Sequence, residues 1–316
     1  MLRAAIVLIF GLFPSLAWAQ SCSFSVTNMN FGLIDTLSGT PATSTATVTM
    51  NCNGAILLQQ RILICPHLGA GTGGASSAAA RQMLSGANSL NYQLYSDSGH
   101  SVVWGSYNWA YASRPPPLSL TLNILGAASG TATIYGLVPG GQSTAVPGTY
   151  LATFSGAHVE FRYLYSNGSS CNTGTGSTAA DPTFTINATI PANCLVATQN
   201  IDFGPKGVLD ANVDATGQVT VTCTPSTAYT VSLNGGTTGG TPTNRKMSKG
   251  AERVTYGLYK DLARSQPWGD AGTPGSTVAG TGTGTAQALT VYGRVSPQAT
   301  PSAGVYTDTV VVTITY

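Results

Sequence analysis

Apolar and polar residues alternate with a period of two along much of this chain. Residues 45–50 (Thr-Ala-Thr-Val-Thr-Met) and 310–315 (Val-Val-Val-Thr-Ile-Thr) are typical runs, rich in β-branched side chains. Such runs recur at short intervals and are separated by Gly, Pro and Asn turns. The pattern predicts an all-β protein, and only residues 75–84 have a helix-like composition.

The first 19 residues follow another pattern. A basic start at Arg3 leads into an apolar run over 4–13, a break at Pro14 and the small-x-small sequence Ala-Trp-Ala at 17–19. This is typical of a signal peptide that is cleaved before Gln20, so residues 1–19 are excluded from the fold. No later run of 18 apolar residues occurs in the sequence, and no other membrane-spanning segment is expected.

The mature chain contains an internal repeat. A Phe-Gly pair begins nine residues after Cys22 and again nine residues after Cys194. A Tyr-x-Leu-Tyr block then precedes a Trp-Gly pair by twelve residues in both halves, at 92–105 and 256–269. Each half closes on an alternating strand. Several short strands at this spacing favour a two-layer β-sandwich, and each half is long enough for one core. We expect domains at 20–171 and 194–316, joined by 172–193.

Cysteine usage agrees with export. The mature chain has an even number of cysteines, and they are Cys22, Cys52, Cys65, Cys171, Cys194 and Cys223. Disulfides are therefore expected, since metal binding would need shorter Cys or His spacings than these. Aligning the halves predicts the pairs Cys22–Cys52 and Cys194–Cys223, which leaves Cys65–Cys171 as an extra bond in the first half.

Charge narrows the classes of function. Charged residues make up 8% of the chain, and the net charge of +2 provides no basic surface for nucleic acid. The three histidines, His67, His100 and His158, have no partners at the spacing of a metal site or a catalytic triad. We therefore expect neither an enzyme nor a cofactor.

Taken in order, these motifs resemble the spore coat U domain, the pilin fold of archaic (Csu-type) chaperone–usher pili. The likeness rests on Cys-x8-Phe-Gly, the Thr-Val-Thr run before the second cysteine, the Tyr-x-Leu-Tyr and Trp-Gly block, and the Gly-x-Tyr closing strand. It covers nearly all of 22–165 and 194–316, and the second half fits better.

The resemblance implies two immunoglobulin-like, pilin-type sandwiches, the second one strand short. Subunits of this class expose a groove that a periplasmic pilus chaperone fills first. At the outer-membrane usher, a donor strand from the adjacent pilin subunit then replaces the chaperone. The closing strand over 306–316 should border this groove, with Val310, Val312, Ile314 and Tyr316 on one face.

Cleavage before Gln20 would leave only two residues ahead of Cys22, too few for a donor strand. A subunit that receives a strand but donates none is expected at the pilus tip, on the cell surface. Residues 184–190 alternate between apolar and polar side chains just before Cys194. They either complete the first domain in cis or form an interdomain strand or extended linker.

The first half also carries two insertions of about seven residues each. From Cys52 to Tyr92 there are 40 residues, against 33 from Cys223 to Tyr256, and a similar excess follows Trp104. We place the insertions around 68–80 and after Trp104, and insertions in a fixed framework lie in loops, where binding is common. The expected surface-binding residues are Tyr107, Trp109, Tyr111, Pro115, Pro116 and Pro117.

Several interpretations of these residues stay open. Shared aromatics such as Trp104 are more typical of packing, and alternating Leu118, Leu120 and Leu122 are typical of a strand's core face. The hydrophobic loops would hold abiotic or host surfaces and support biofilm formation. The alternatives are a lectin-like tip that binds a glycan and a secreted spore-coat or matrix protein.

Overall fold

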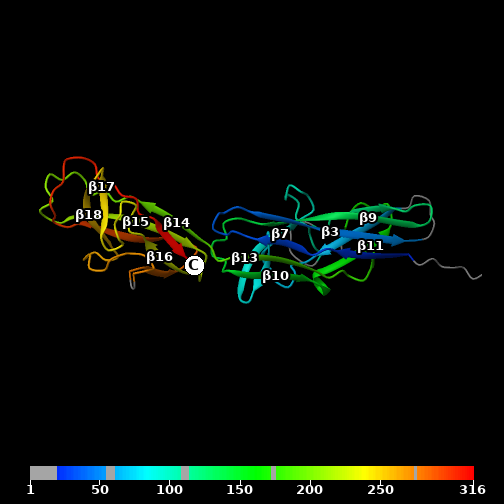
Figure 1. Cartoon of the computed structure of the whole chain (residues 1–316). Coiled ribbons are helices and arrows are strands. Elements are labelled where there is room, and N and C mark those ends of the chain that lie inside the picture. The colour runs from blue at the N-terminus through cyan, green and yellow to red at the C-terminus, as the bar shows by residue number, and fades with distance from the viewer. Residues whose placement is uncertain (1–19, 55–60, 108–113, 172–175, 274–275) are drawn as a thin grey trace, which may run out of the picture.

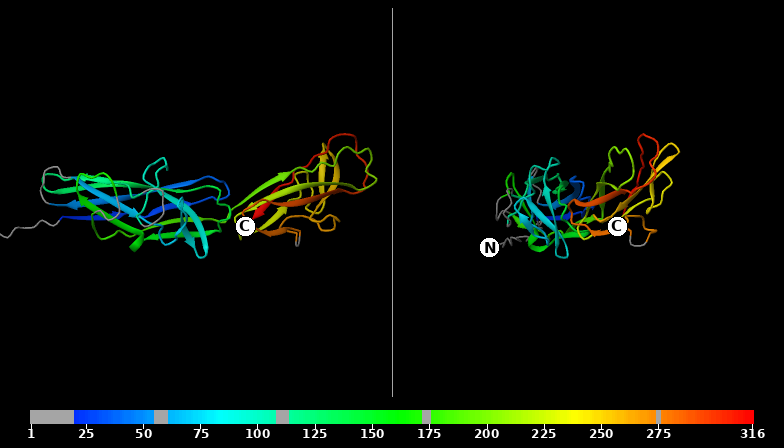
Figure 2. Two further views of the ribbon diagram at one scale, coloured as in Figure 1. Left: turned by 180° about the vertical axis from the view of Figure 1, so that it is seen from behind. Right: turned by 90° about the vertical axis from the view of Figure 1, so that its left-hand side faces the viewer.

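The computed structural model describes residues 20–54, 61–107, 114–171, 176–273 and 276–316. The expected signal peptide at 1–19, together with Trp109 and Tyr111, lies outside these residues. Over the described ranges the chain is all-β apart from one 3-10 turn, η1 (Gly156–His158), which confirms the predicted fold class. Two sandwich domains lie end to end in an elongated molecule, and the C-terminus lies near the junction between them (Figures 1 and 2).

The first domain has two sheets. Its strands are β1 (Ser21–Val26), β2 (Met29–Leu33), β3 (Ala42–Asn53), β4 (Arg61–Leu68), β5 (Ala75–Ser77), β6 (Ala80–Ser85), β7 (Asn88–Tyr95), β8 (Leu118–Thr121), β9 (Ala127–Val138), β10 (Gly148–Phe154), β11 (Val159–Tyr165), β12 (Ser177–Thr178) and β13 (Phe184–Ile190). The larger sheet has the order β1-β3-β9-β7-β6-β10-β13-β2, with β5 beside β6. The smaller sheet is β12-β11-β4-β8.

The second domain repeats this plan with fewer strands. They are β14 (Cys194–Gln199), β15 (Val213–Cys223), β16 (Ala228–Leu233), β17 (Arg245–Lys249), β18 (Glu252–Tyr259), β19 (Val278–Thr281), β20 (Gln287–Val295) and β21 (Val312–Thr315). One sheet has the order β14-β15-β20-β18-β17 and the other β19-β16-β21. Strand for strand, these orders match β1-β3-β9-β7-β6 and β8-β4-β11 of the first domain.

The repeated motifs form the framework of both cores. Trp104 and Trp268 are both almost fully buried, and their indole nitrogens donate to the carbonyls of Pro66 and Val231 at 2.8 and 3.1 Å. The packing interpretation of the shared aromatics is therefore confirmed. The disulfides Cys22–Cys52, Cys194–Cys223 and Cys65–Cys171 are present, the same pairs that the repeat predicts.

The helix-like interpretation of 75–84 is wrong. This stretch forms β5 and β6, and β6 pairs with β7 over five residue pairs. Its alanines favour a helix only weakly, whereas pairing in the sheet buries Arg81 and Met83 on its inner face. Tertiary contacts thus decide the conformation.

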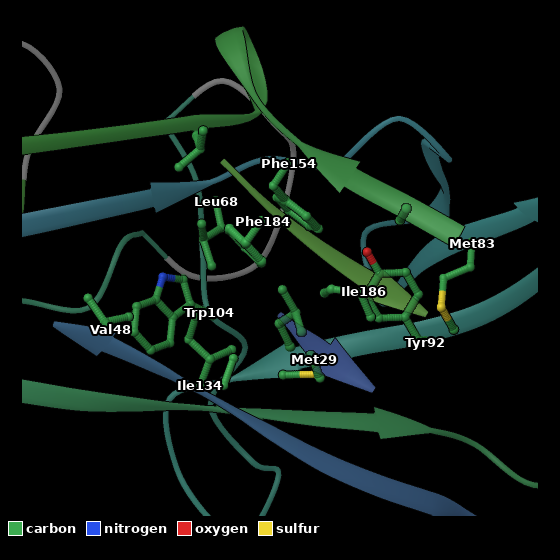
Figure 3. Close-up of a cluster of buried hydrophobic side chains, with 14 of the residues drawn as sticks. Met29, Val48, Leu68, Met83, Tyr92, Trp104, Ile134, Phe154, Phe184 and Ile186 are labelled. Atoms are coloured by element: carbon green, nitrogen blue, oxygen red, sulfur yellow. The ribbon is translucent and has the colours of Figure 1, made fainter. Parts of the chain in front are cut away.

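Residues 184–190 form β13, which belongs to the first domain. The strand pairs antiparallel with β10 along its whole length and parallel with β2. Its inward side chains, Phe184, Ile186, Ala188 and Ile190, are all buried. Figure 3 shows Phe184 and Ile186 inside the core beside Phe154 and Met29. Only residues 191–193 then separate β13 from β14.

Candidate functional site

The second domain has a gap at the position that β13 fills in the first. In the first domain β10 touches β6 through the pair Leu151 and Leu84, and β13 follows on its other side. In the second domain residues 304–310 take the place of β10. They touch β17 through a bridge between Thr307 and Ser248. Within the described residues, the other side of 304–310 has no strand partner.

Two matching tyrosines confirm this correspondence. The hydroxyl of Tyr150 donates to the carbonyl of Val146 at 2.7 Å, and that of Tyr306 donates to the carbonyl of Ser302 at 2.9 Å. Both hydrogen bonds reach four residues back along the chain. Tyr306 is thus the counterpart of Tyr150, Asp308 of Ala152 and Val310 of Phe154.

The gap is a groove of mixed apolar and polar lining between residues 304–310 and residues 200–207. It consists of two adjoining hollows of about 650 and 670 Å³ that share Ile201, Phe203, Met247 and Tyr306 among their lining residues. Ile201 and Phe203 are half-buried here, whereas their counterparts Met29 and Phe31 in the first domain are buried. The groove therefore opens directly onto the core of the second domain.

A hydrogen-bonded pair, Tyr256 and Asp308, lies in this lining. The hydroxyl of Tyr256 donates to Oδ2 of Asp308 at 2.7 Å, and the backbone N–H of Thr237 donates to Oδ1 at 2.9 Å. Burial and the hydrogen bond to Asp308 both raise the pKa of Tyr256, so its hydroxyl keeps its proton and remains a donor. Asp308 shares the inward face of its segment with Tyr306 and Val310.

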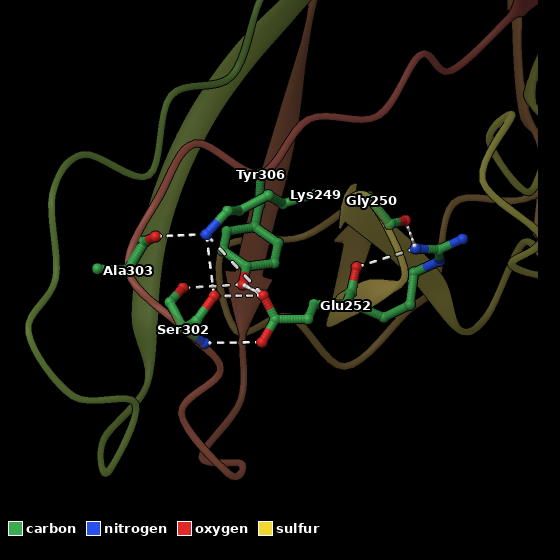
Figure 4. A network of polar contacts seen from close by, with 7 residues as sticks. Lys249, Gly250, Glu252, Ser302, Ala303 and Tyr306 are labelled. Carbon is green, nitrogen blue, oxygen red and sulfur yellow. Dashed lines mark hydrogen bonds and ion pairs between the residues drawn. The ribbon is translucent and has the colours of Figure 1, made fainter.

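A polar network holds one end of the groove (Figure 4). The carboxylate of Glu252 accepts hydrogen bonds from the N–H and hydroxyl of Ser302 and from the hydroxyl of Tyr306, the last at 3.0 Å. The ammonium of Lys249 donates to the hydroxyl of Ser302 at 2.9 Å. Hydrogen bonds from Ser302 are the main cause that lowers the pKa of Glu252. The network ties the start of 304–310 to the β17–β18 hairpin.

The expected single closing strand over 306–316 is wrong, because it divides between the two sheets. Residues 304–310 run beside β17, and β21 pairs with β16 in the other sheet. Val310 and Val312 line the groove, as expected, whereas Ile314 and Tyr316 are not among its lining residues. Tyr316 is 56% exposed at the domain junction, and its hydroxyl lies 3.5 Å from Oδ1 of Asn193.

The expected exposure of the surface-binding residues is partly wrong. Pro115 is buried, Pro116 is half-buried and only Pro117 is exposed. Tyr107 is half-buried, with its ring stacked on His67 at 5.6 Å between centroids and the guanidinium of Arg162 5.3 Å above it. These contacts hold Tyr107 against β4 and β11. Leu118 and Leu120 lie on the inner face of β8 as expected, and Leu122 is buried.

The structure also changes the position of the insertions. Pro66 comes 14 residues after Cys52, but its counterpart Val231 comes eight residues after Cys223, so six extra residues precede Pro66 rather than following it. The carbonyls of Pro66 and Val231 accept from the two matching indoles, and this fixes their correspondence. The first insertion therefore lies in the stretch that contains residues 55–60, which are outside the described residues.

The second insertion lies in the segment from β8 to β9, two strands that belong to different sheets. Leu118 pairs with Ile64 and Gly280 with Tyr229, so Leu118 and Gly280 correspond. From Leu118 to Tyr135 there are 17 residues, against 12 from Gly280 to Tyr292. Most of the excess after Trp104 thus lies beyond the loop around Tyr107.

The connection between β8 and β9 lies at the far end of the first domain. The β-sheet register places Ala127 beside Asn53 and Asn53 beside Ser21, at the end remote from the second domain (Figure 1). Its turn carries Ile124 and Leu125, which are 73% and 72% exposed. The sequence signal was available, since both residues interrupt the polar pattern of a turn, but their exposure depends on the register.

Two buried arginines were missed by sequence reasoning. Arg81 donates to the carbonyls of Leu68, Gly69 and Trp104 at 2.7–2.8 Å. Arg245 donates to those of Leu233, Asn234 and Trp268 at 2.8–2.9 Å. Each joins the loop after the Tyr-x-Leu-Tyr strand to the end of β4 or β16, so the pair is structural. A basic residue at matching positions of the repeat is the signal that could have found it.

Two kinds of site do not occur in the described part of the chain. No group of three or more His, Cys, Asp or Glu side chains is arranged to hold a metal ion there. In the same residues no helix has the length and apolar character needed to cross a bilayer.

The fold and groove define a two-domain, pilin-type β-sandwich protein with one completed and one open domain. The family model of the Spore Coat Protein U domain matches residues 11–156 and 180–313, once for each half. The chain therefore belongs to the Spore Coat Protein U domain family, which confirms the resemblance inferred from its motifs. None of the curated proteins compared with the chain matches it.

The chain is also similar to solved structures. One is the CsuC–CsuE chaperone–tip adhesion subunit pre-assembly complex from archaic chaperone-usher Csu pili of Acinetobacter baumannii. It is 17% identical, with 94% of this chain and 100% of that chain covered and a TM-score of 0.52. Another is the CupB6 tip adhesin from Pseudomonas aeruginosa, 15% identical over 93% of each chain, with a TM-score of 0.43.

Proposed function

We propose that this protein is the tip adhesin subunit of an archaic chaperone–usher pilus. The second domain is the pilin domain, and its groove receives a strand from a periplasmic chaperone. At the outer-membrane usher, a strand from the adjacent pilin subunit replaces it. The observation that carries the proposal is the contrast between a groove filled by β13 in the first domain and the equivalent open groove in the second.

In this proposal β13 is the cis donor strand of the first domain, which needs no partner to complete its core. The first domain is then free to present its far end as the adhesive surface on the exported pilus. Ile124 and Leu125 support this assignment, because exposed aliphatic side chains gain free energy when contact with a surface buries them. Burying each would contribute roughly 1.5–3 kcal/mol. The surfaces served are abiotic or host surfaces, and attachment leads to biofilm.

The adhesive part of the proposal is tested with the double variant Ile124→Ser/Leu125→Ser. We expect retention of pili on polystyrene to fall several-fold, with the melting temperature of the first domain unchanged. Leu262→Ser is the matched control, since Leu262 is 71% exposed on the second domain. Unchanged retention would contradict the assignment of these loops. Adhesion abolished by a soluble glycan would favour the lectin-like alternative instead.

The assembly part is tested by expressing the chain in the periplasm with and without a periplasmic chaperone of an archaic chaperone–usher pilus. We expect the two proteins to co-purify as a complex, and soluble chain to be recovered in much lower yield without the chaperone. Equal yields of soluble monomer with and without the chaperone would favour the secreted coat or matrix alternative.

A further inference from the structure

The filled groove of the first domain gives a template for the open groove of the second. In the first domain β10 and β13 are antiparallel, with Phe154 opposite Phe184, Ala152 opposite Ile186 and Tyr150 opposite Ala188. Directly opposed residues lie on the same face of a sheet and contact each other. The inward row of β13 thus reads large, large, small along this edge, and Ile190 completes it opposite Gly148.

The second domain keeps this edge with one chemical change. Val310 stands where Phe154 does, Tyr306 where Tyr150 does, and Gly304 where Gly148 does. Asp308 stands in the place of Ala152, which is fully buried against Ile186 in the first domain. An apolar core position has therefore become a carboxylate that faces the groove.

A strand seated in this groove would remove water from the Asp308 carboxylate. Tyr256 already donates to Oδ2, and the backbone N–H groups of Thr237 and Thr309 donate to Oδ1. Each carboxylate oxygen accepts more than one hydrogen bond, so Oδ2 retains capacity toward the groove. An aliphatic side chain opposite it would displace water without replacing the hydrogen bond that the water gave to the carboxylate. A hydroxyl or amide would supply a charge-assisted hydrogen bond instead.

We propose that the groove selects a strand of another polypeptide by a side-chain pattern that Asp308 sets. The strand lies antiparallel to 304–310, with an apolar residue opposite Val310, a hydrogen-bond donor such as Ser, Thr or Asn opposite Asp308, and a small residue opposite Tyr306. This rests on the proposed function of the groove and names the strand it takes.

The same pattern excludes a second copy of this chain. The strand β13 of another molecule would set Ile186 against Asp308 and bury the carboxylate beside an aliphatic group. Selectivity of this kind arises from an unfavourable contact with the wrong partner as much as from a good contact with the right one. Asp308 thus disfavours association of identical subunits through exchange of β13.

The experiment fuses a strand to the C-terminus of the full chain. Tyr316 lies at the domain junction (Figure 1), six residues beyond Val310, opposite which such a strand would begin. One fusion carries a flexible linker long enough to return to Val310, followed by a copy of β13, Phe-Thr-Ile-Asn-Ala-Thr-Ile. The other replaces its third residue by Thr. Both are made with Asp308 intact and with Asp308→Ala, and calorimetry follows the melting temperature of the second domain.

With Asp308 intact, we expect the second domain to melt at a higher temperature in the fusion with the Thr-bearing strand than in the fusion with the Ile-bearing strand. The expected difference is on the order of 5 °C. In Asp308→Ala the order reverses, because the position again resembles Ala152. Equal stabilisation by both strands in both backgrounds would overturn the pattern while leaving the groove as a strand acceptor. Failure of every fusion to raise the melting temperature would refute the proposed function of the groove itself.

Discussion

The two domains share one framework and differ at one strand position. In the first, β13 lies between β10 and β2, and Tyr150, Ala152 and Phe154 are fully buried. In the second, the matching residues Tyr306, Asp308 and Val310 are only half-buried along an open groove. The comparison teaches that the shared framework of disulfide, buried tryptophan and buried arginine does not by itself close a core of this type. A single strand, supplied by the chain or by a partner, decides whether the core is closed.

Deleting residues 183–190 is the strongest test of this comparison, because it should have the largest effect on the stability of the first domain. Four buried side chains and the whole β10–β13 ladder would be lost, more than the roughly 5–15 kcal/mol that holds a domain together. We expect the first domain to lose its calorimetric transition while the second keeps its own. Asn187→Ser, on the outward face of β13, is the control and should change stability by less than about 0.5 kcal/mol. A first domain that still melts cooperatively after the deletion would contradict the comparison.

The buried arginines test whether the framework is equivalent in the two domains. Arg81→Met should destabilise only the first domain and Arg245→Met only the second, each by about 4 kcal/mol. Three carbonyls lose their donor in Arg81→Met and four in Arg245→Met, at about 1–3 kcal/mol for each group left unsatisfied. Separate transitions in calorimetry measure both effects. If one variant lowered both transitions together, the domains would not be independent units.

The disulfide Cys65–Cys171 tests the part that only the first domain has. It closes a loop of 106 residues, so replacing both cysteines by serine should lower the stability of the first domain by about 3 kcal/mol. The open groove is untouched, and the second transition should stay in place. If reductant destabilised the first domain equally in the double variant and in the parent, the Cys65–Cys171 bond would not contribute to its stability.

The smallest effect concerns pH. Because the pKa of Glu252 is lowered in the folded protein, its network stabilises the second domain at neutral pH. This stabilisation is lost as pH falls below about 4, through the lowered pKa of the folded state. The first domain has Asn88 at the matching position. We expect the gap in melting temperature between the parent and Glu252→Gln to close from pH 7 to pH 3. A gap that stays constant over this range would exclude the network as its cause.

Much of the framework follows from sequence because its signals are local or repeated. The disulfide pairs and the buried tryptophans could be predicted since both halves carry the same residues at the same spacing. The alternation over 184–190 likewise predicted a strand, although its partner β10 lies more than 30 residues away and could be assigned only from the structure.

The remaining features depend on which strands pair. Residues 75–84 became strands because β7 was available, and the closing strand divided because Asp308 and β21 serve different sheets. Counting residues found both insertions but misplaced the first, since only the indole hydrogen bonds at Pro66 and Val231 align β4 with β16. Tyr107 and Pro115 were expected on the surface, but Tyr107 is half-buried and Pro115 is buried, whereas Ile124 and Leu125 are exposed.

The short connection between β13 and β14 has a mechanical consequence. Tension along the molecule enters the first domain through residues 191–193 and pulls β13 along its own axis, so the hydrogen bonds to β10 are loaded together in shear. If β13 slid out, the chain could lengthen only as far back as Cys171, where the disulfide to Cys65 anchors it to β4. The released slack of 172–190 would be about 65 Å. The extra disulfide therefore limits how far a pulled molecule can extend while its far end stays folded and attached.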